Sequence, residues 1–257
     1  MAERVSDPPR VSVVVPFFDS GRHLRACIES LLALDARPGE VELIFVDNGS
    51  TDDSAAIAAD FRGITVLHEA TAGAYAARNT GIRVARAPII AFTDADCIVD
   101  RDWVRAIIAG MTDPEVGALL GHCRYPDNAS LPLRLLGAYE NAKIAVVAGR
   151  CPPANRFAYC NNMAVRASIF DEIGPFREWR RAADSELVHR MGLNRPELKL
   201  VHDPAVRITH LEFTRARDRA RRLRLYTETN AQIDGFRELN VSQRLAILWF
   251  WLRGAGR

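Results

Sequence analysis

The sequence predicts an α/β protein in which helices flank a mostly parallel sheet. Short, mainly apolar runs at residues 11–15, 41–46 and 89–93 indicate strands, and the first, which is almost entirely β-branched, fits a parallel strand covered on both faces. Segments with the apolar periodicity of helices separate these runs, at residues 23–34 and 74–85. Strands and helices that alternate at this spacing are typical of doubly wound sheets, which bind ligands beyond the carboxyl ends of their strands.

Two further elements complete the first half of the chain. A short strand is expected at residues 64–67, and a helix is expected to start at Ser50 or Thr51 and run to Phe61, since hydroxyl side chains favour the position before a helix. The pattern in the second half is less regular. There we expect helices at residues 102–111, 131–147, 168–173 and 183–191, and a helical tail at 214–252. We expect strands at residues 116–121, at 158–165 on the sheet edge, at 198–202 and at 206–209.

Composition narrows the class of protein. The chain has 257 residues and is 48% hydrophobic, which suffices for a full core, so we treat residues 1–257 as one domain. The formal net charge of +2 lacks the basic excess of nucleic-acid-binding proteins, and no nucleic-acid partner is expected. No apolar run reaches the roughly 18 to 20 residues of a membrane span. No G-x-G-x-x-G motif follows the first strand, which argues against a dinucleotide-binding fold.

The five cysteines are scattered without a C-x-x-C pair, which argues against a zinc site and against a dense disulfide framework. We interpret them as reduced thiols, with a bridge between Cys151 and Cys160 left open. The polar first ten residues lack the apolar region of a signal peptide. We therefore expect a cytoplasmic protein.

Two carboxylates follow the predicted strand at residues 89–93. Asp94 and Asp96 are separated by one residue, so in an extended segment their side chains point to the same side. A hard divalent cation such as Mg²⁺ or Mn²⁺ takes oxygen ligands and would balance the two charges. A solvated acidic loop would show the same short pattern. Asp19 and Asp47 follow two other predicted strands, so acidic groups gather at one edge of the sheet.

Six segments, taken in order, resemble family 2 glycosyltransferases of the GT-A fold. They are VVVP at residues 13–16, VDNGSTD at 46–52, ARNTG at 77–81, TDAD at 93–96, NMAVR at 162–166 and DSEL at 184–187. Each segment alone is weak, but their order within residues 11–210 is specific. The resemblance implies a GT-A (Rossmann-like) sheet with a helical C-terminal extension. It also implies an inverting transfer of a sugar from a nucleotide diphosphate donor, expected to be a UDP-sugar, to a hydroxyl acceptor.

The resemblance divides the chain by role. Residues 11–96 would form the donor half, 97–213 the acceptor and catalytic half, and 214–257 a helical tail. The positions that would bind the nucleotide sugar are Pro16, Phe18, Asp19, Asp47, Gly73, Arg78, Asp94 and Ala95.

Three of these donor-side positions have competing interpretations. Phe18 would stack on the donor base, or would be a buried residue at the start of a loop. Asp47 would accept a hydrogen bond from the base, or would cap a helix. Arg78 would reach the base or the phosphates, or would be a solvated surface residue.

The resemblance assigns the metal to Asp96 and His210, with Mn²⁺ or Mg²⁺ as cofactor, while Asp94 would contact the ribose or reach the metal through water. A divalent metal that bridges the phosphates stabilises the charge that grows as the sugar bond breaks. A neutral imidazole beside carboxylates is compatible with Mn²⁺. A purely structural His210 is the competing interpretation.

Inversion needs a base that takes the proton of the acceptor hydroxyl. The resemblance assigns this role to Asp184, which is expected to open a helix; a structural Asp that complements the helix dipole is the alternative. Ala183 replaces the Glu that commonly precedes the base in the family, and Glu186 is the fallback base. Phe17 and Asp19 also depart from the family pattern, in the loop that would contact the donor base.

The Q-x-x-R-W signature of processive synthases is absent after Asp184, so we expect a single transfer per encounter. The acceptor would be a carbohydrate, a lipid-linked molecule or a small molecule. An Arg-rich run precedes Trp249, which indicates either a solvated helix face or peripheral membrane contact through residues 214–257. Two other functions remain open. A sugar-phosphate nucleotidyltransferase would need a Gly-rich, basic loop after the first strand, and a catalytically silent nucleotide-sugar binding module would fit the departure at Ala183.

Overall fold

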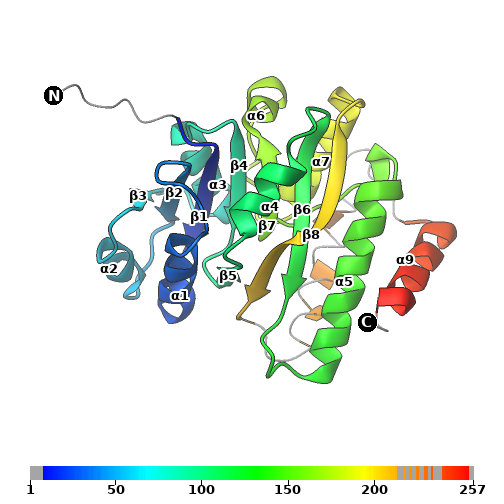
Figure 1. The fold of residues 1–257 in the computed structure, drawn as a ribbon, viewed down its shortest axis with the longest axis horizontal. Helices are drawn as coiled ribbons and strands as arrows, with labels where there is room; N and C mark the ends of the chain where they lie inside the picture. Colours follow the sequence, from blue (N-terminus) through cyan, green and yellow to red (C-terminus); the bar gives the residue numbers. More distant parts are fainter. Residues whose placement is uncertain are drawn as a thin grey trace.

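A computed structural model describes residues 8–212, 217, 220–221, 224–225, 229–230, 233 and 239–254. Its eight-stranded sheet has the order β3-β2-β1-β4-β7-β6-β8-β5, with helices on both faces (Figure 1). This confirms the predicted α/β class. Among the described residues, no helix has both the length and the apolar character needed to cross a membrane.

The first half of the chain forms a parallel block. Its strands pair in the order β3-β2-β1-β4, and they are β1 (Val11–Phe17), β2 (Val41–Asp47), β3 (Thr65–His68) and β4 (Ile89–Thr93). The connecting helices are α1 (Gly21–Leu32), α2 (Ser54–Ala59) and α3 (Ala74–Val84). Because the four strands run in one direction, their carboxyl ends meet at one edge of the sheet.

The second half mixes strand directions. Strand β7 (Asn162–Arg166) runs antiparallel to both of its neighbours, β4 and β6 (Val116–Arg124). Strand β8 (Lys199–His210) runs parallel to β6 and antiparallel to the edge strand β5 (Cys97–Val99). Among the described residues, the helices of this half are α4 (Trp103–Gly110), α5 (Leu131–Arg150), α6 (Ala167–Ile173), α7 (Ala183–Asn194), α9 (Val241–Gly254) and a 3₁₀ turn (Pro153–Asn155).

Four sequence predictions need correction. The strand predicted at the sheet edge is the shorter β7, and it lies between β4 and β6. The two strands predicted at 198–202 and 206–209 form one strand, β8, and the three-residue strand β5 was not predicted. Helix α2 begins at Ser54, because the Ser50 hydroxyl and the Thr51 backbone instead bond to the Asp19 loop. The predicted tail at 214–252 lies largely outside the described residues, apart from α9.

Two apolar clusters stabilise the two faces of the sheet. Alternation along β1 places Val13 and Val15 in the cluster with α1 and α4, and Val14 in the cluster with α5 and α7. Burial of each such side chain contributes about 1.5–3 kcal/mol. All five cysteines are free, so Cys151 and Cys160 form no bridge.

Candidate functional site

A cavity of about 560 Å³ opens at the carboxyl ends of β1 and β4. Seven of the residues assigned to donor or metal from the sequence line it: Pro16, Phe18, Asp19, Arg78, Asp94, Ala95 and Asp96. Four others lie outside this lining: Asp47, Gly73, Asp184 and His210. The strand ends therefore bring together residues from three separate sequence segments, as a parallel sheet predicts.

Phe18 presents an exposed ring to this cavity. Its exposed fraction is 57%, whereas the neighbouring Phe17 is 2% exposed and packs in the core. The interpretation of Phe18 as a buried loop residue is therefore wrong. An exposed aromatic ring at the mouth of a cavity offers a face on which a flat ligand group can stack.

Asp19 ties the loop after β1 to the loop after β2. Its backbone has a φ of 43°, a left-handed conformation that Asp and Asn tolerate better than most residues. Its Oδ1 accepts hydrogen bonds from the Thr51 backbone N–H, at 2.7 Å, and from the Thr51 hydroxyl, at 3.2 Å. These bonds hold the cavity rim in place.

Asp47 and Gly73 shape the cavity from outside its lining. Asp47 Oδ1 accepts a hydrogen bond of 2.9 Å from the Ser50 N–H, and α2 begins further on, so Asp47 caps no helix. Gly73 has a φ of 137°, which requires glycine, and its N–H donates to Asn48 Oδ1 at 2.6 Å. Asn48 also donates to the Glu69 and Thr71 carbonyls, so the loops after β2 and β3 are joined.

Arg78 and Asp94 form an ion pair at the cavity wall. The Arg78 Nη2 lies 2.5 Å from Asp94 Oδ1, and the guanidinium carbon lies 5.2 Å from the centroid of the Tyr75 ring. Arg78 is 5% exposed, so the interpretation as a solvated surface arginine is wrong. Arg78 neutralises the negative charge of Asp94 and fixes the orientation of its carboxylate.

Asp96 lies beside His210. The Asp96 Oδ2 is 3.8 Å from His210 Nδ1, and the Cys97 Sγ is 3.6 Å from Asp96 Oδ1. The pairing of β5 with β8 sets Cys97 opposite His210, and the Leu211 N–H donates to the Asp96 carbonyl at 2.8 Å. In the part of the chain that the structure describes, these three side chains are the one group close enough to share a metal ion. Burial raises the pKa of the Cys97 thiol well above its usual value, so the carboxylate and the imidazole are the donors that suit Mn²⁺.

Asp184 opens helix α7 and is 1% exposed. Its Oδ2 accepts from the Cys160 N–H at 3.0 Å and its Oδ1 from the Ser185 N–H at 2.9 Å. Burial raises the pKa of Asp184, while these bonds, the Arg78 charge and a hydrogen bond with Tyr75 lower it. Tyr75 also lines the cavity, so it contacts both the cavity and the carboxylate.

Glu186, the fallback base, is held by two arginines. Its Oε1 lies 3.0 Å from Arg177 Nε and 2.7 Å from Arg190 Nε, and its side chain is 6% exposed. The Glu186 carboxylate is thus already engaged by two cationic side chains and does not line the cavity. The structure therefore favours a structural role for Glu186.

Sequence reasoning missed several residues that line the cavity or support the site. They are Arg22, His23, Asn48, Tyr75, Cys97, Arg180, Arg181 and Glu212. Tyr75 carried a usable signal, because it precedes Arg78 by three residues and so shares its face of α3. Arg180 and Arg181 carried none, since they come from a loop without periodicity.

The mixed α/β sheet, with acidic residues at the ends of β1 and β4 and a cavity beyond them, matches the fold of GT-A glycosyltransferases of known structure. The sequence profile described as Glycosyl transferase family 2 matches residues 12–174, and the chain belongs to this family.

The chain is also similar to individual proteins. Glycosyltransferase AglE of Haloferax volcanii is 26% identical over 175 residues, which are 65% of this chain and 56% of AglE. The uncharacterized glycosyltransferase YibD of Escherichia coli is 40% identical over 91 residues, which are 34% of this chain and 26% of YibD. The chain thus spans about half or less of the length of these relatives.

Solved structures share the fold. Mannosyltransferase PcManGT of Pyrobaculum calidifontis, in complex with GDP-Man and Mn²⁺, has a TM-score of 0.72 and 21% identity, covering 98% of this chain and 74% of PcManGT. Glucosyl-3-phosphoglycerate synthase of Mycobacterium tuberculosis, in complex with Mn²⁺, UDP and phosphoglyceric acid, has a TM-score of 0.63 and 17% identity, covering 90% of this chain and 80% of the synthase.

Proposed function

We propose that the chain is an inverting, metal-dependent glycosyltransferase that moves a sugar from a nucleotide diphosphate, foremost UDP, to a hydroxyl acceptor. One observation carries this proposal. Asp96 lines the cavity that also holds Phe18 and the Arg78–Asp94 pair, and it lies 3.8 Å from His210. Membership of family 2 supports the transferase and speaks against the nucleotidyltransferase alternative. The structural neighbours with GDP-Man, or with UDP and Mn²⁺, support a nucleotide donor and a divalent ion.

Asp96 and His210 would hold Mn²⁺ or Mg²⁺. When bound, the ion stabilises the charge that develops on the leaving diphosphate. The residues of the chain supply the remaining contacts. The Phe18 ring stacks on the base, Asp47 sets the shape of the loop that meets the base, and Asp94 orients the ribose.

Asp184 would act as the base. The acceptor oxygen attacks the anomeric carbon on the face opposite the diphosphate, its proton passes to Asp184, and the bond from the sugar to the diphosphate breaks with inversion. The raised pKa of Asp184 suits a proton acceptor. Because the carboxylate is 1% exposed, an acceptor hydroxyl reaches it only when a neighbouring side chain moves, and Tyr75 lines the cavity and bonds to the carboxylate.

The two halves of the chain would divide the work. Residues 11–96 would bind the donor, and residues 97–213 would carry the base and the acceptor contacts. The transfer would occur once per encounter. Because Asp184 is buried, one alternative function is retained, a nucleotide-sugar binding module without catalysis. Such a module would also bind the donor but would release no nucleotide.

Thermal unfolding with nucleoside diphosphates, each with and without Mn²⁺, tests the proposal. A ligand at 100 times its Kd adds about 2.7 kcal/mol, which corresponds to a rise in Tm of about 5–10 °C for a domain of this size. Asp96→Asn should abolish the part of the rise that depends on Mn²⁺. Asp60→Asn, at a carboxylate that is 71% exposed and does not line the cavity, should retain it. If no nucleoside diphosphate raises Tm with Mn²⁺ present, the proposal is wrong.

Peripheral membrane contact through α9 is a separate proposal about the partners. Val241, Leu245, Leu248 and Trp249 are exposed on one face of this helix, and Arg217, Arg221 and Arg224 are exposed near it in sequence. Apolar anchors beside basic residues suit an anionic membrane surface. Replacing Leu245 and Leu248 by Ser should weaken sedimentation with anionic liposomes, while Leu32→Ser, at an exposed leucine of α1, should not. Equal sedimentation of all three proteins would contradict membrane contact through α9.

A further inference from the structure

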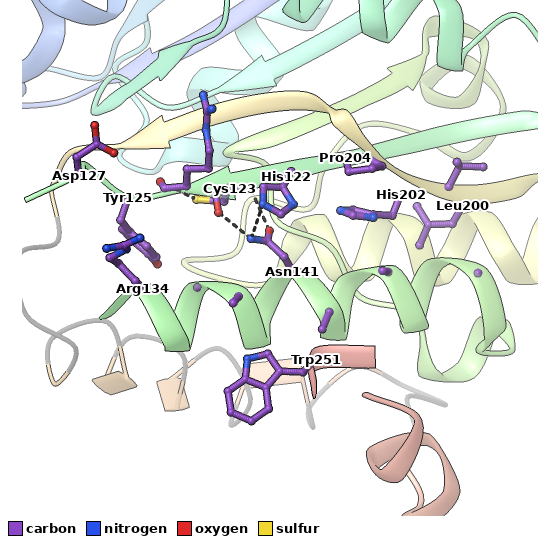
Figure 2. Close-up of a pocket in the computed structure, with 17 residues that line it drawn as sticks. His122, Cys123, Tyr125, Asp127, Arg134, Asn141, Leu200, His202, Pro204 and Trp251 are labelled. Carbon is purple, nitrogen blue, oxygen red and sulfur yellow. Dashed lines mark hydrogen bonds between the residues drawn. The ribbon is translucent and has the colours of Figure 1, made fainter. Parts of the chain in front are cut away.

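A second cavity, of about 770 Å³, lies between helix α5 and strands β6 and β8 (Figure 2). The face of α5 that lines it is built mainly from the smallest residues, at positions Gly137, Ala138, Ala142, Ala145 and Gly149. Large residues of the same helix, such as Ile144 and Val147, point into the core instead. The space is therefore set by the sequence of α5, and its volume falls within the range of small-molecule sites, about 300–1,000 Å³.

The interior of this cavity is apolar, and its neutral polar groups include Asn141, His122, His202 and the buried Trp251 Nε1–H, which has no hydrogen-bond partner among the described residues. Leu200 and Trp251 contribute apolar surface, and the Asn141 amide donates to His122 Nε2 at 3.2 Å (Figure 2). Burial lowers the pKa of His122 and lowers the pKa of His202 to about 4, so both rings are neutral at neutral pH. The His202 Nε2 is buried and makes no hydrogen bond to any part of the chain that the structure describes. A neutral imidazole can bond to a ligand hydroxyl, and such a bond would satisfy this nitrogen.

One end of the cavity lies near His210, a residue proposed to hold the metal. Tyr125 lines this end, and its ring centroid lies 6.4 Å from that of His210. Two charged side chains, Asp127 and Arg134, lie beside Tyr125 (Figure 2), and Arg124 also lines the cavity. Arg124 is already paired with Asp100. The charged end thus faces the metal site, and the apolar end lies towards Leu200 and away from it.

The cavity also approaches the proposed base. Asn141 and Cys123 line both this cavity and a small neighbouring pocket of about 30 Å³. Tyr159 and Asn161 line that small pocket as well, on either side of Cys160, whose N–H bonds to Asp184. A molecule in the large cavity would therefore lie near His210 at its Tyr125 end, and near the backbone that bonds to Asp184 where Asn141 and Cys123 line it.

We propose that this cavity binds the aglycone of the acceptor, a neutral and largely apolar or aromatic group, with its hydroxyl-bearing end at Tyr125. The role as acceptor rests on the proposed function, but binding itself needs no donor. A charge on the part of the aglycone near Leu200 is excluded, because that end of the cavity offers no opposite charge and burial of an unpaired ion is costly. His202 would position a hydroxyl or ether oxygen of the aglycone and would take no part in the proton transfer.

The probes are octyl β-glucoside, below its critical micelle concentration, and methyl β-glucoside, each titrated without nucleotide by calorimetry. An octyl chain that enters an apolar cavity should bind at least about tenfold more tightly than the methyl group, since each buried CH₂ adds about 0.8 kcal/mol. Ala138→Trp places a large ring in the cavity at an exposed position and should remove this preference. Leu135→Trp, also exposed on α5 but outside the lining, should retain it.

Two further variants test the details. His202→Leu should keep the preference for octyl over methyl glucoside but lose the tighter binding of an 8-hydroxyoctyl glucoside over octyl glucoside. The double variant Leu245→Ser, Leu248→Ser should leave octyl binding unchanged, because the outer face of α9 does not line the cavity.

Three results would overturn the inference: equal affinity for the two probes, equal behaviour of Ala138→Trp and Leu135→Trp, or loss of octyl binding in the α9 double variant. Failure of the nucleotide experiment with octyl binding intact would contradict the proposed function alone. Failure of octyl binding with nucleotide stabilisation intact would contradict the cavity assignment alone.

Discussion

The two halves of the sheet present their carboxylates in opposite ways. The parallel half delivers Asp19 and Asp94 to an open cavity, where each is held by bonds to a neighbouring loop or helix. In the mixed half, Asp184 lies near the start of helix α7, where it is 1% exposed and accepts hydrogen bonds from two backbone N–H groups. The proposed donor side, with Asp19 and Asp94, is preorganised and is called the open side, whereas the proposed base Asp184 is buried and is called the closed side. Binding of the donor and transfer of the acceptor proton to Asp184 should therefore respond to different substitutions.

The largest effect is expected on the closed side. Asp184→Asn should lower kcat by about 10²- to 10⁴-fold, because an amide cannot take the proton of the acceptor. The KM for the donor should stay close to that of the parent, since Asp184 does not line the donor cavity. Steady-state kinetics with a saturating acceptor measure both quantities.

Glu186→Gln is the matched control two residues away. Loss of its charge weakens the bonds to Arg177 and Arg190, so the free energy of unfolding should fall by about 1–3 kcal/mol, measured by urea denaturation. The kcat of Glu186→Gln, measured well below its Tm, should equal that of the parent protein. If Glu186→Gln loses kcat and Asp184→Asn does not, Glu186 is the base and the comparison between open and closed sides fails.

The open side could be predicted from the sequence because its residues follow directly after regular strands. The run at residues 89–93 has a clear end, so Asp94 and Asp96 are placed at the sheet edge by local pattern alone. The same holds for Phe18 and Asp19 after β1. Their exposure and their bonds to other loops could not be predicted, since these depend on neighbouring strands.

The positions of His210 and Asp184 depend on contacts between residues that lie far apart in the sequence. Strand β5 has three residues, too few for a periodic pattern, yet its pairing with β8 brings His210 to Asp96. The central place of β7 depends on antiparallel contacts with both β4 and β6, which a short apolar run does not specify. The burial of Asp184 likewise depends on Tyr75 and on the Cys160 backbone. The small residues of α5 show the periodicity of an ordinary helix, so the cavity beside them was not predicted.

An intermediate effect is expected on the open side. Phe18→Ala should raise the KM for the donor by about 2- to 10-fold, because stacking of an aromatic ring contributes about 0.5–1.5 kcal/mol. With saturating donor, kcat should not change. Since Phe18 is 57% exposed, Tm should also stay constant. Leu32→Ala, at a leucine that is 44% exposed on α1, is the control and should leave KM as it is. A fall in kcat without a change in KM would show that Phe18 acts on the transfer step and not on donor binding.

The smallest effect is expected where the two sides meet, at Tyr75. The Tyr75 hydrogen bond lowers the pKa of Asp184, so Tyr75→Phe should raise that pKa further. A base acts in its ionised form, and activity rises as the pH passes through its pKa. The acidic limb of the kcat profile should therefore move to higher pH, while kcat on the plateau above it stays the same. Tyr139→Phe removes a hydroxyl from α5 outside both cavities and should leave the limb in place. A limb that does not move in Tyr75→Phe would mean that the titrating group is not Asp184, and the link between the open cavity and the closed carboxylate would be lost.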